Sequence, residues 1–137
     1  TQLHAAQSIV EFNEITRRHG RTPVEWLDSI GLLGPDLIIG HGIFLNDHPQ
    51  IHYPHTNDFE RLRDSGASVA HCPTVFARRG MVLNSIGRYM NAGITVGIGT
   101  DTFPPSINWA KNATRQANWT DKGPSASESQ LGIFWDR

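Results

Sequence analysis

The stretch Ile94-Thr95-Val96-Gly97-Ile98-Gly99-Thr100-Asp101 decides the fold, because it is a short β-branched run, interrupted only by glycine, that ends in a carboxylate. A run of this length and composition is typical of a buried parallel strand. Ligands and catalytic groups in α/β folds collect at the carboxyl ends of such strands. The stretch therefore predicts a parallel sheet with Asp101 at its functional edge.

Three earlier stretches share this design, and each ends in a histidine: 1–4, 37–41 and 67–71. The steps from His4 to His41, from His41 to His71 and from His71 to Asp101 are 37, 30 and 30 residues long. Steps of this length suit one strand and one helix each. The pattern predicts alternating strands and helices, which form a parallel sheet with right-handed crossovers.

The segments between these strands carry helix signals. Thr22 and Glu25 form a capping box, and Asn57 and Glu60 are expected to cap the next helix in the same way. Residues 46–55 hold two prolines and three histidines and predict a long loop beside a pocket, whereas residues 76–80 predict an exposed turn. Helices are expected at 5–19, 22–30, 57–66, 85–91, 107–119 and 125–137.

Composition places the chain among soluble globular proteins of one domain. Its 137 residues are 38% hydrophobic and 18% charged, and no apolar run approaches the length of a membrane span. The formal charge is −1 with dispersed basic residues, which argues against a nucleic-acid partner. Cys72 is the single cysteine, so an internal disulfide is excluded and a reducing, cytoplasmic location is expected.

Histidine and carboxylate side chains at one edge of a sheet make a metal site plausible. Imidazole and carboxylate ligands suit zinc or ferrous iron, and neither ion requires cysteine. A single histidine at a strand end is more often structural than functional, but here several strand ends repeat the pattern. These residues alone leave two classes open, a metal-dependent hydrolase and a flavodoxin-like binding domain.

Several blocks resemble a known family. Gly66-Ala67-Ser68-Val69-Ala70-His71-Cys72-Pro73-Thr74, followed by 91–101, resembles the seventh- and eighth-strand signature of the amidohydrolase superfamily. Gly40-His41-Gly42-Ile43-Phe44-Leu45 is similar to the sixth-strand histidine motif, and Leu3-His4-Ala5-Ala6 to the fifth-strand motif. The likeness is to the branch of cytosine and guanine deaminases and triazine hydrolases.

The resemblance implies the C-terminal half of a (β/α)8 barrel, strands 5–8 with their helices, so that residues 1–137 form a partial amidohydrolase barrel domain without its N-terminal half. It implies one divalent metal held by His4 and Asp101 together with a His-x-His pair of the first strand. Zinc is the first expectation for this metal, and iron is the alternative. His41 would orient the water or the substrate. Asp101 would also take a proton from the attacking water and pass it toward the leaving group.

The chain departs from the family pattern in ways that affect these roles. It contains no His-x-His pair, and Gln7 stands where the deaminases have a glutamate. Glutamine can hydrogen-bond a substrate but cannot transfer a proton, so Gln7 is expected to bind substrate. His71 is expected in a structural or substrate-facing role near the site. Val75-Phe76 replaces a small polar pair and suggests an apolar pocket wall.

We therefore expect the parent protein to be a metal-dependent hydrolase, a deaminase or amidohydrolase that cleaves a C–N bond of a small cyclic or heteroaromatic substrate. The alternative is a non-catalytic α/β binding module or an inactive fragment that lacks the His-x-His pair. A half-barrel has two exposed strand edges, so we expect a homo-oligomer or completion by the missing half. The chain alone is expected to bind zinc weakly, without turnover.

Overall fold

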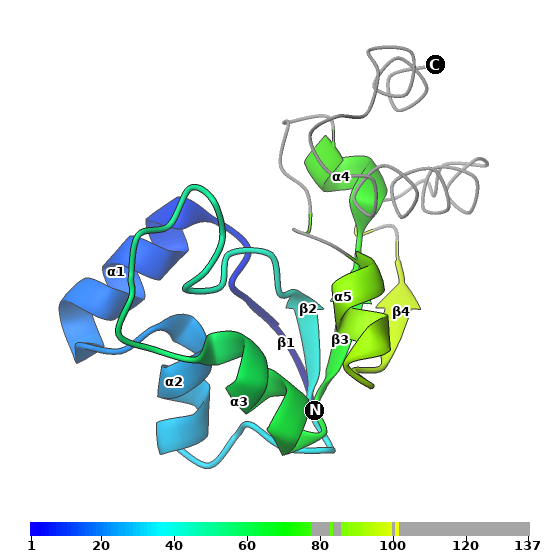
Figure 1. Ribbon diagram of the computed structural model, residues 1–137, viewed down its shortest axis with the longest axis horizontal. Helices are drawn as coiled ribbons and strands as arrows, with labels where there is room; N and C mark the ends of the chain where they lie inside the picture. Colours follow the sequence, from blue (N-terminus) through cyan, green and yellow to red (C-terminus); the bar gives the residue numbers. More distant parts are fainter. Residues whose placement is uncertain (78–82, 84–85, 100, 102–137) are drawn as a thin grey trace.

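The computed structural model describes residues 1–77, 83, 86–99 and 101, and its sheet has four parallel strands in sequential order (Figure 1). The strands are β1 (Gln2–Ala5), β2 (Ile38–His41), β3 (Ser68–His71) and β4 (Val96–Ile98). Each strand pairs with the next, so the predicted α/β class with a parallel sheet is confirmed. The helices expected at 107–119 and 125–137 lie outside the described residues.

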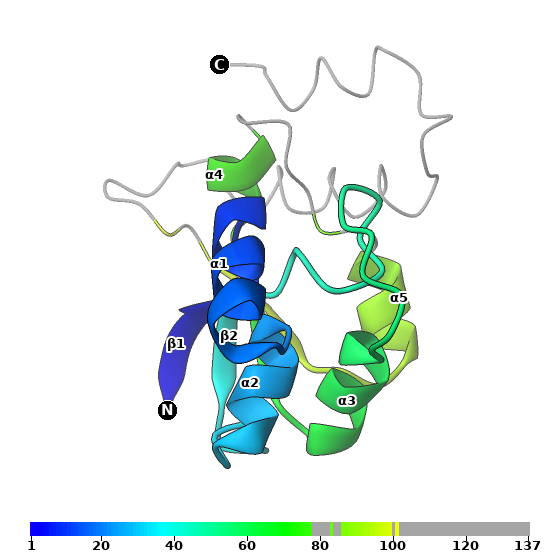
Figure 2. The ribbon, with the colours of Figure 1, turned by 90° about the vertical axis from the view of Figure 1, so that its left-hand side faces the viewer.

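Four helices gather on one side of this sheet, as Figures 1 and 2 show together: α1 (Ile9–His19), α2 (Pro23–Ser29), α3 (Asp58–Ser65) and α5 (Ile86–Asn91). In both views the short helix α4 (Pro73–Ala77) lies beyond the carboxyl ends of the strands. Within the described ranges, no helix is long and apolar enough to cross a membrane.

Two helix starts show how local sequence determines these elements. The capping box of α2 is present, because the Thr22 hydroxyl accepts from the Glu25 amide at 3.1 Å and the Glu25 carboxylate accepts from the Thr22 amide at 3.2 Å. The expected cap of α3 is wrong. Asn57 makes no side-chain cap and instead accepts from Arg61 at 3.4 Å, since its backbone does not take the extended conformation of a capping residue.

The core lies between the helices and one face of the sheet. On that face the register aligns Leu3, Ile39, Val69 and Val96, and the two central side chains are fully buried against the helix residues of the core. The opposite face carries Ile38, which is 42% exposed. The sheet is thus covered on one face, and its carboxyl-terminal edge remains free to carry functional groups.

The segment after β3 differs from the expected exposed turn at residues 76–80. Residues 73–77 form α4, which begins at Pro73, a residue favoured at the first helical position because it has no amide hydrogen to satisfy. Phe76 is buried and belongs to the core. The expectation of an exposed turn is therefore wrong for residues 76 and 77, while residues 78–80 lie outside the described part.

Candidate metal centre

The ends of β1 and β2 bring two histidines together. In the register His4 lies opposite Gly40, and an added Cβ at Gly40 would sit only 2.7 Å from Cδ2 of His4. The imidazole therefore packs directly over the glycine backbone. The rings of His4 and His41 are 4.7 Å apart between centroids in an edge-to-face arrangement. The His4 side chain is 51% exposed and that of His41 is 1% exposed, so the first imidazole is accessible to solvent and the second is buried.

Backbone geometry at the end of β2 redirects His41. Strict alternation along a strand would place His41 on the same face as Ile39, the face that the helices cover. His41 instead has a φ of +87°, a conformation that non-glycine residues rarely adopt. Such strained residues cluster at functional sites, where surrounding contacts hold them in place. This departure from strand geometry accompanies the approach of the His41 ring to that of His4.

The turns that follow β1 and β2 are joined by backbone hydrogen bonds. Ala6, with a φ of +52°, accepts from the amides of Ile43 and Phe44, each at 2.8 Å. The carbonyl of Ala5 accepts from the amide of Gly42 at 3.2 Å. Because these bonds connect the residues directly after His4 and His41, the separation of the two imidazoles is determined by the backbone as well as by side-chain packing.

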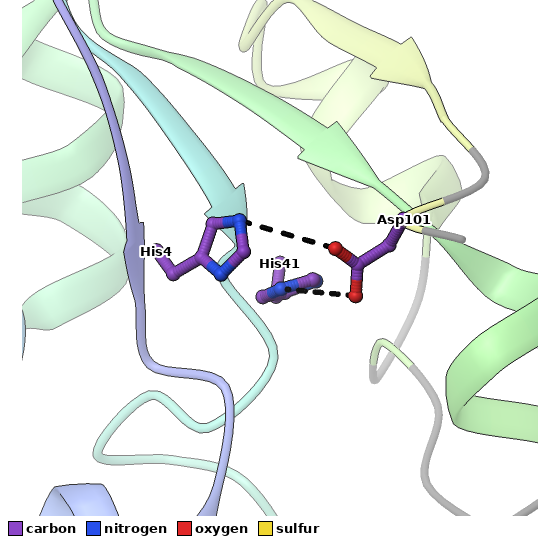
Figure 3. A group of neighbouring side chains, drawn as sticks. All are labelled: His4, His41 and Asp101. Carbon is purple, nitrogen blue, oxygen red and sulfur yellow. Dashed lines mark ion pairs between the residues drawn. The ribbon is translucent and has the colours of Figure 1, made fainter. Parts of the chain in front are cut away.

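Asp101, beyond the end of β4, completes the cluster (Figure 3). Its Oδ1 lies 3.9 Å from Nε2 of His4, and its Oδ2 lies 3.7 Å from Nε2 of His41. Each of the three residues offers one ligand atom, and these atoms lie within 4.8 Å of one another. The separations are too long for direct hydrogen bonds. Ligand atoms around a tetrahedral zinc ion are about 3.4 Å apart, so the cluster is slightly open for such an ion.

The surroundings of His41 favour a neutral imidazole that still needs a partner. Burial lowers the pKa of His41 below its usual value, the charge of Asp101 opposes this effect, and His4 lowers the pKa further. Neither ring nitrogen has a hydrogen-bond partner among the described residues. Phe76 packs on the ring with centroids 4.5 Å apart. A buried unpaired imidazole nitrogen is costly, and a cation would satisfy it. The donor set thus fits a metal ion.

The other two expected site residues lie outside this cluster. His71 ends β3, where it pairs with Ile98, and its side chain is fully buried. Its carbonyl accepts from the amide of Gly99 at 2.8 Å, which ties β3 to the segment that leads to Asp101. Gln7 follows β1 and is half-buried. Their roles toward substrate therefore remain predictions.

The loop after β2 is held by a buried carboxyl that the sequence did not single out. Asp58 accepts from the Thr22 hydroxyl at 2.5 Å and from the Asn46 amide at 2.9 Å, and the Asn46 side chain accepts from the Asp58 amide at 3.0 Å. Burial raises the pKa of Asp58 to about 6, although both hydrogen bonds lower it. The exposed histidines of this loop, His52 and His55, are not part of the cluster.

Glu11 is a second residue that sequence reasoning missed, and a signal for it was present. Ser8-Ile9-Val10-Glu11 matches the capping-box pattern at the start of α1. The Ser8 hydroxyl accepts from the Glu11 amide at 3.1 Å, as the pattern predicts. The Glu11 carboxylate, however, reaches past Ser8 to the amides of Ala6 and Gln7.

The chain is thus an α/β protein with a parallel sheet, in which two histidines and an aspartate at the carboxyl ends of the strands could hold a metal ion. The chain belongs to the amidohydrolase family, whose profile matches residues 1–135. It is 34% identical to 5-methylthioadenosine/S-adenosylhomocysteine deaminase of Thermococcus kodakarensis over 99 residues. These residues make up 72% of this chain and 21% of that protein. It is 35% identical to 5'-deoxyadenosine deaminase of Methanopyrus kandleri over 100 residues, which make up 73% of this chain and 21% of that protein. The chain thus spans about a fifth of the length of these relatives.

Solved structures show the same fold at lower identity. Atrazine chlorohydrolase from Arthrobacter aurescens, complexed with zinc and atraton, matches 95% of this chain and 28% of its own chain, with a TM-score of 0.69 and 20% identity. The match to an adenosine deaminase from Xanthomonas campestris with bound zinc covers 96% of this chain and 29% of the deaminase chain, with a TM-score of 0.68 and 19% identity. The four parallel strands therefore match part of an amidohydrolase barrel.

Proposed function

We propose that this chain forms strands 5–8, the C-terminal half, of the (β/α)8 barrel of a metal-dependent deaminase, and that it supplies part of the metal centre. One observation carries the proposal. His4, His41 and Asp101 come from three different strand ends, and their ligand atoms lie within 4.8 Å of one another. The order of the family motifs along the chain supports the assignment of the half.

His4 and Asp101 would hold the ion in this arrangement, with further ligands from outside the described residues. Zinc is the expected ion, because imidazole and carboxylate suit it and two of the similar structures hold zinc. A divalent zinc ion bound there would bring the pKa of water toward about 7 and so make hydroxide available at neutral pH.

The residues of the chain would then divide the work of C–N bond hydrolysis. Asp101 accepts the proton of the attacking water on a carboxylate oxygen and delivers it to the leaving nitrogen. His41, which burial keeps neutral, orients the water or the substrate through a ring nitrogen. Gln7 and His71 would contact substrate. Gln7 can donate or accept a hydrogen bond but cannot carry the proton.

The substrate class that the relatives support best is an adenine nucleoside, whose exocyclic amine would be released as ammonia. The deaminases of Thermococcus kodakarensis and Methanopyrus kandleri carry names of this substrate class. We further propose that the exposed face of the sheet, which includes Ile38, is covered in the working protein by the other half of the barrel or by a second copy of the chain.

Zinc titration of the 137-residue chain, followed by competition with a chromophoric chelator, tests this proposal. We expect binding of one ion, weakened about tenfold or more in His4→Ala and in Asp101→Ala. His55→Ala is the matched control, because His55 is exposed and lies outside the cluster. Binding that is indifferent to both cluster substitutions would remove these residues from the metal and favour a non-catalytic binding module.

A further inference from the structure

The carboxylate of Glu11 holds the turn that follows β1. Its Oε1 accepts from the amide of Ala6 and its Oε2 from the amide of Gln7, each at 2.9 Å. Hydrogen bonds to an ionised carboxylate are about twice as strong as neutral ones. Glu11 lies in the first turn of α1, so one helical side chain binds two consecutive peptide groups just beyond the strand that carries His4.

The peptide groups that Glu11 binds belong to a strained segment. Ala6 is fully buried and has a φ of +52°, a left-handed conformation that is strained in a residue other than glycine. Such a conformation persists only where the surroundings over-determine it. The two hydrogen bonds that the Glu11 carboxylate accepts from the Ala6 and Gln7 amides help to hold this conformation.

The same turn is connected to the second histidine. The carbonyl of Ala6 accepts from the amides of Ile43 and Phe44, which follow His41. A change in the Ala6 peptide therefore reaches both strand ends, one through the chain to His4 and the other through these bonds to His41. Glu11 itself lies outside the cluster of possible ligands, so any effect on a metal ion passes through this backbone.

We propose that Glu11 is a positioning residue of the metal centre, which fixes the separation and direction of the His4 and His41 imidazoles by clamping the Ala6 turn. The inference rests on the proposed function, since it requires that His4 binds the ion. Groups that hold metal ligands in place without binding the ion themselves orient those ligands, and their loss costs about 10- to 100-fold in metal affinity.

The test compares Glu11→Gln and Glu11→Ala with Glu14→Ala. The Gln variant keeps the shape of the side chain but replaces one acceptor oxygen with a donor that faces a backbone amide. Glu14 lies on the same helix and pairs with Arg17 and Arg18 on the exposed surface, so its replacement removes a carboxylate of α1 without touching the turn. For each variant we would measure zinc affinity, the visible absorption of the cobalt-loaded chain at saturation, and thermal unfolding.

We expect zinc affinity to fall about tenfold in both Glu11 variants and the cobalt absorption to change in position and intensity. Glu14→Ala should match the wild type in both. The cobalt spectrum at saturation reports the geometry of bound ions only, so it does not change when a variant is merely less stable. Amide exchange of Ala6 and Gln7, followed by NMR without metal, should be faster in the Glu11 variants than in Glu14→Ala.

The outcomes separate the two proposals. If zinc binds the His4→Ala variant as tightly as it binds the wild type, the proposed function is overturned, and this inference with it. Wild-type binding that depends on His4, together with unchanged affinity and cobalt absorption in a folded Glu11→Gln, overturns only the positioning role. If neither Glu11 variant folds, Glu11 serves the fold as a whole and the specific assignment to the metal centre is wrong.

Discussion

Replacing Gly40 by alanine would place a methyl group against the His4 imidazole. The added Cβ would lie 2.7 Å from Cδ2 of His4 and 3.5 Å from its Nε2. Carbon atoms pack best at about 3.5–4.0 Å, so the ring would have to move by about 1 Å. Ligand distances in metal sites tolerate shifts of about 0.2 Å. We therefore expect Gly40→Ala to weaken zinc binding about tenfold or more.

The fold itself should tolerate this change. The nearest backbone atom to the new Cβ is the carbonyl oxygen of Leu3 at 3.4 Å, and the flexible His4 side chain can swing away. Glycine within a strand is less favourable than alanine by about 0.5–1 kcal/mol, because it loses more backbone entropy on folding. The midpoint of thermal unfolding should therefore stay constant or rise slightly while metal affinity falls.

Gly97→Ala provides the matched control for calorimetric zinc titration and thermal unfolding. Gly97 lies in the same row of the sheet as Gly40, separated from it by Ala70, and its added Cβ would meet only the carbonyl oxygen of Val69 at 3.9 Å. Equal zinc affinity in Gly40→Ala and Gly97→Ala, with both chains folded, would refute the idea that the packing of His4 over Gly40 determines the centre.

Three further predictions concern buried groups. Burial raises the pKa of Asp58 from 3.8 to about 6, so the stability from its neutral form is full below the unfolded pKa and is lost as the pH rises through 6. Urea unfolding should show a loss of about 2–3 kcal/mol from pH 4 to 8 relative to Asp58→Asn, and parallel pH profiles would contradict this. Tyr89→Phe removes a buried bond of 2.9 Å to the Gly42 carbonyl and should lower the free energy of unfolding by about 1–3 kcal/mol; an unchanged urea midpoint would argue against it. Burial raises the pKa of the Cys72 thiol to about 11, so iodoacetamide at pH 8 should label the folded chain far more slowly than the urea-unfolded chain, and equal rates would disprove the burial.

The sheet and part of the centre were predictable because they depend on local pattern. The short stretches that end in a histidine or an aspartate predicted the four strands of the described residues, and parallel strands bring their carboxyl ends to one edge. The approach of His4, His41 and Asp101 follows from that rule. His71 satisfies the same pattern but lies outside the cluster and is fully buried. The difference depends on register and on the positive φ of His41, which no single-residue preference reveals.

The supporting contacts were not predictable because they join residues that are distant in sequence. Thr22 was recognised as a helix cap, but its hydroxyl also donates to Asp58, 36 residues away. Asn57 has a capping residue type, yet its backbone conformation prevents the cap. Propensity describes what a side chain can do next to its own backbone, whereas these outcomes depend on how α2, α3 and the loop after β2 pack together.

The sequential strand order also has a consequence for how this chain acquires its structure. Paired residues of neighbouring strands are 36, 30 and 27 positions apart, as in Gln2 with Ile38, Ile38 with Ser68 and Val69 with Val96. The entropy of closing a loop grows only with the logarithm of its length, so these closures differ by about 0.3 kcal/mol. No pairing is strongly favoured as the first, and an existing pair can grow at either edge, by the strand that precedes it or by the strand that follows it in the sequence. Folding should therefore proceed by stepwise growth from several starting points, with the bond from Thr22 to Asp58 and that from Tyr89 to Gly42 joining successive units.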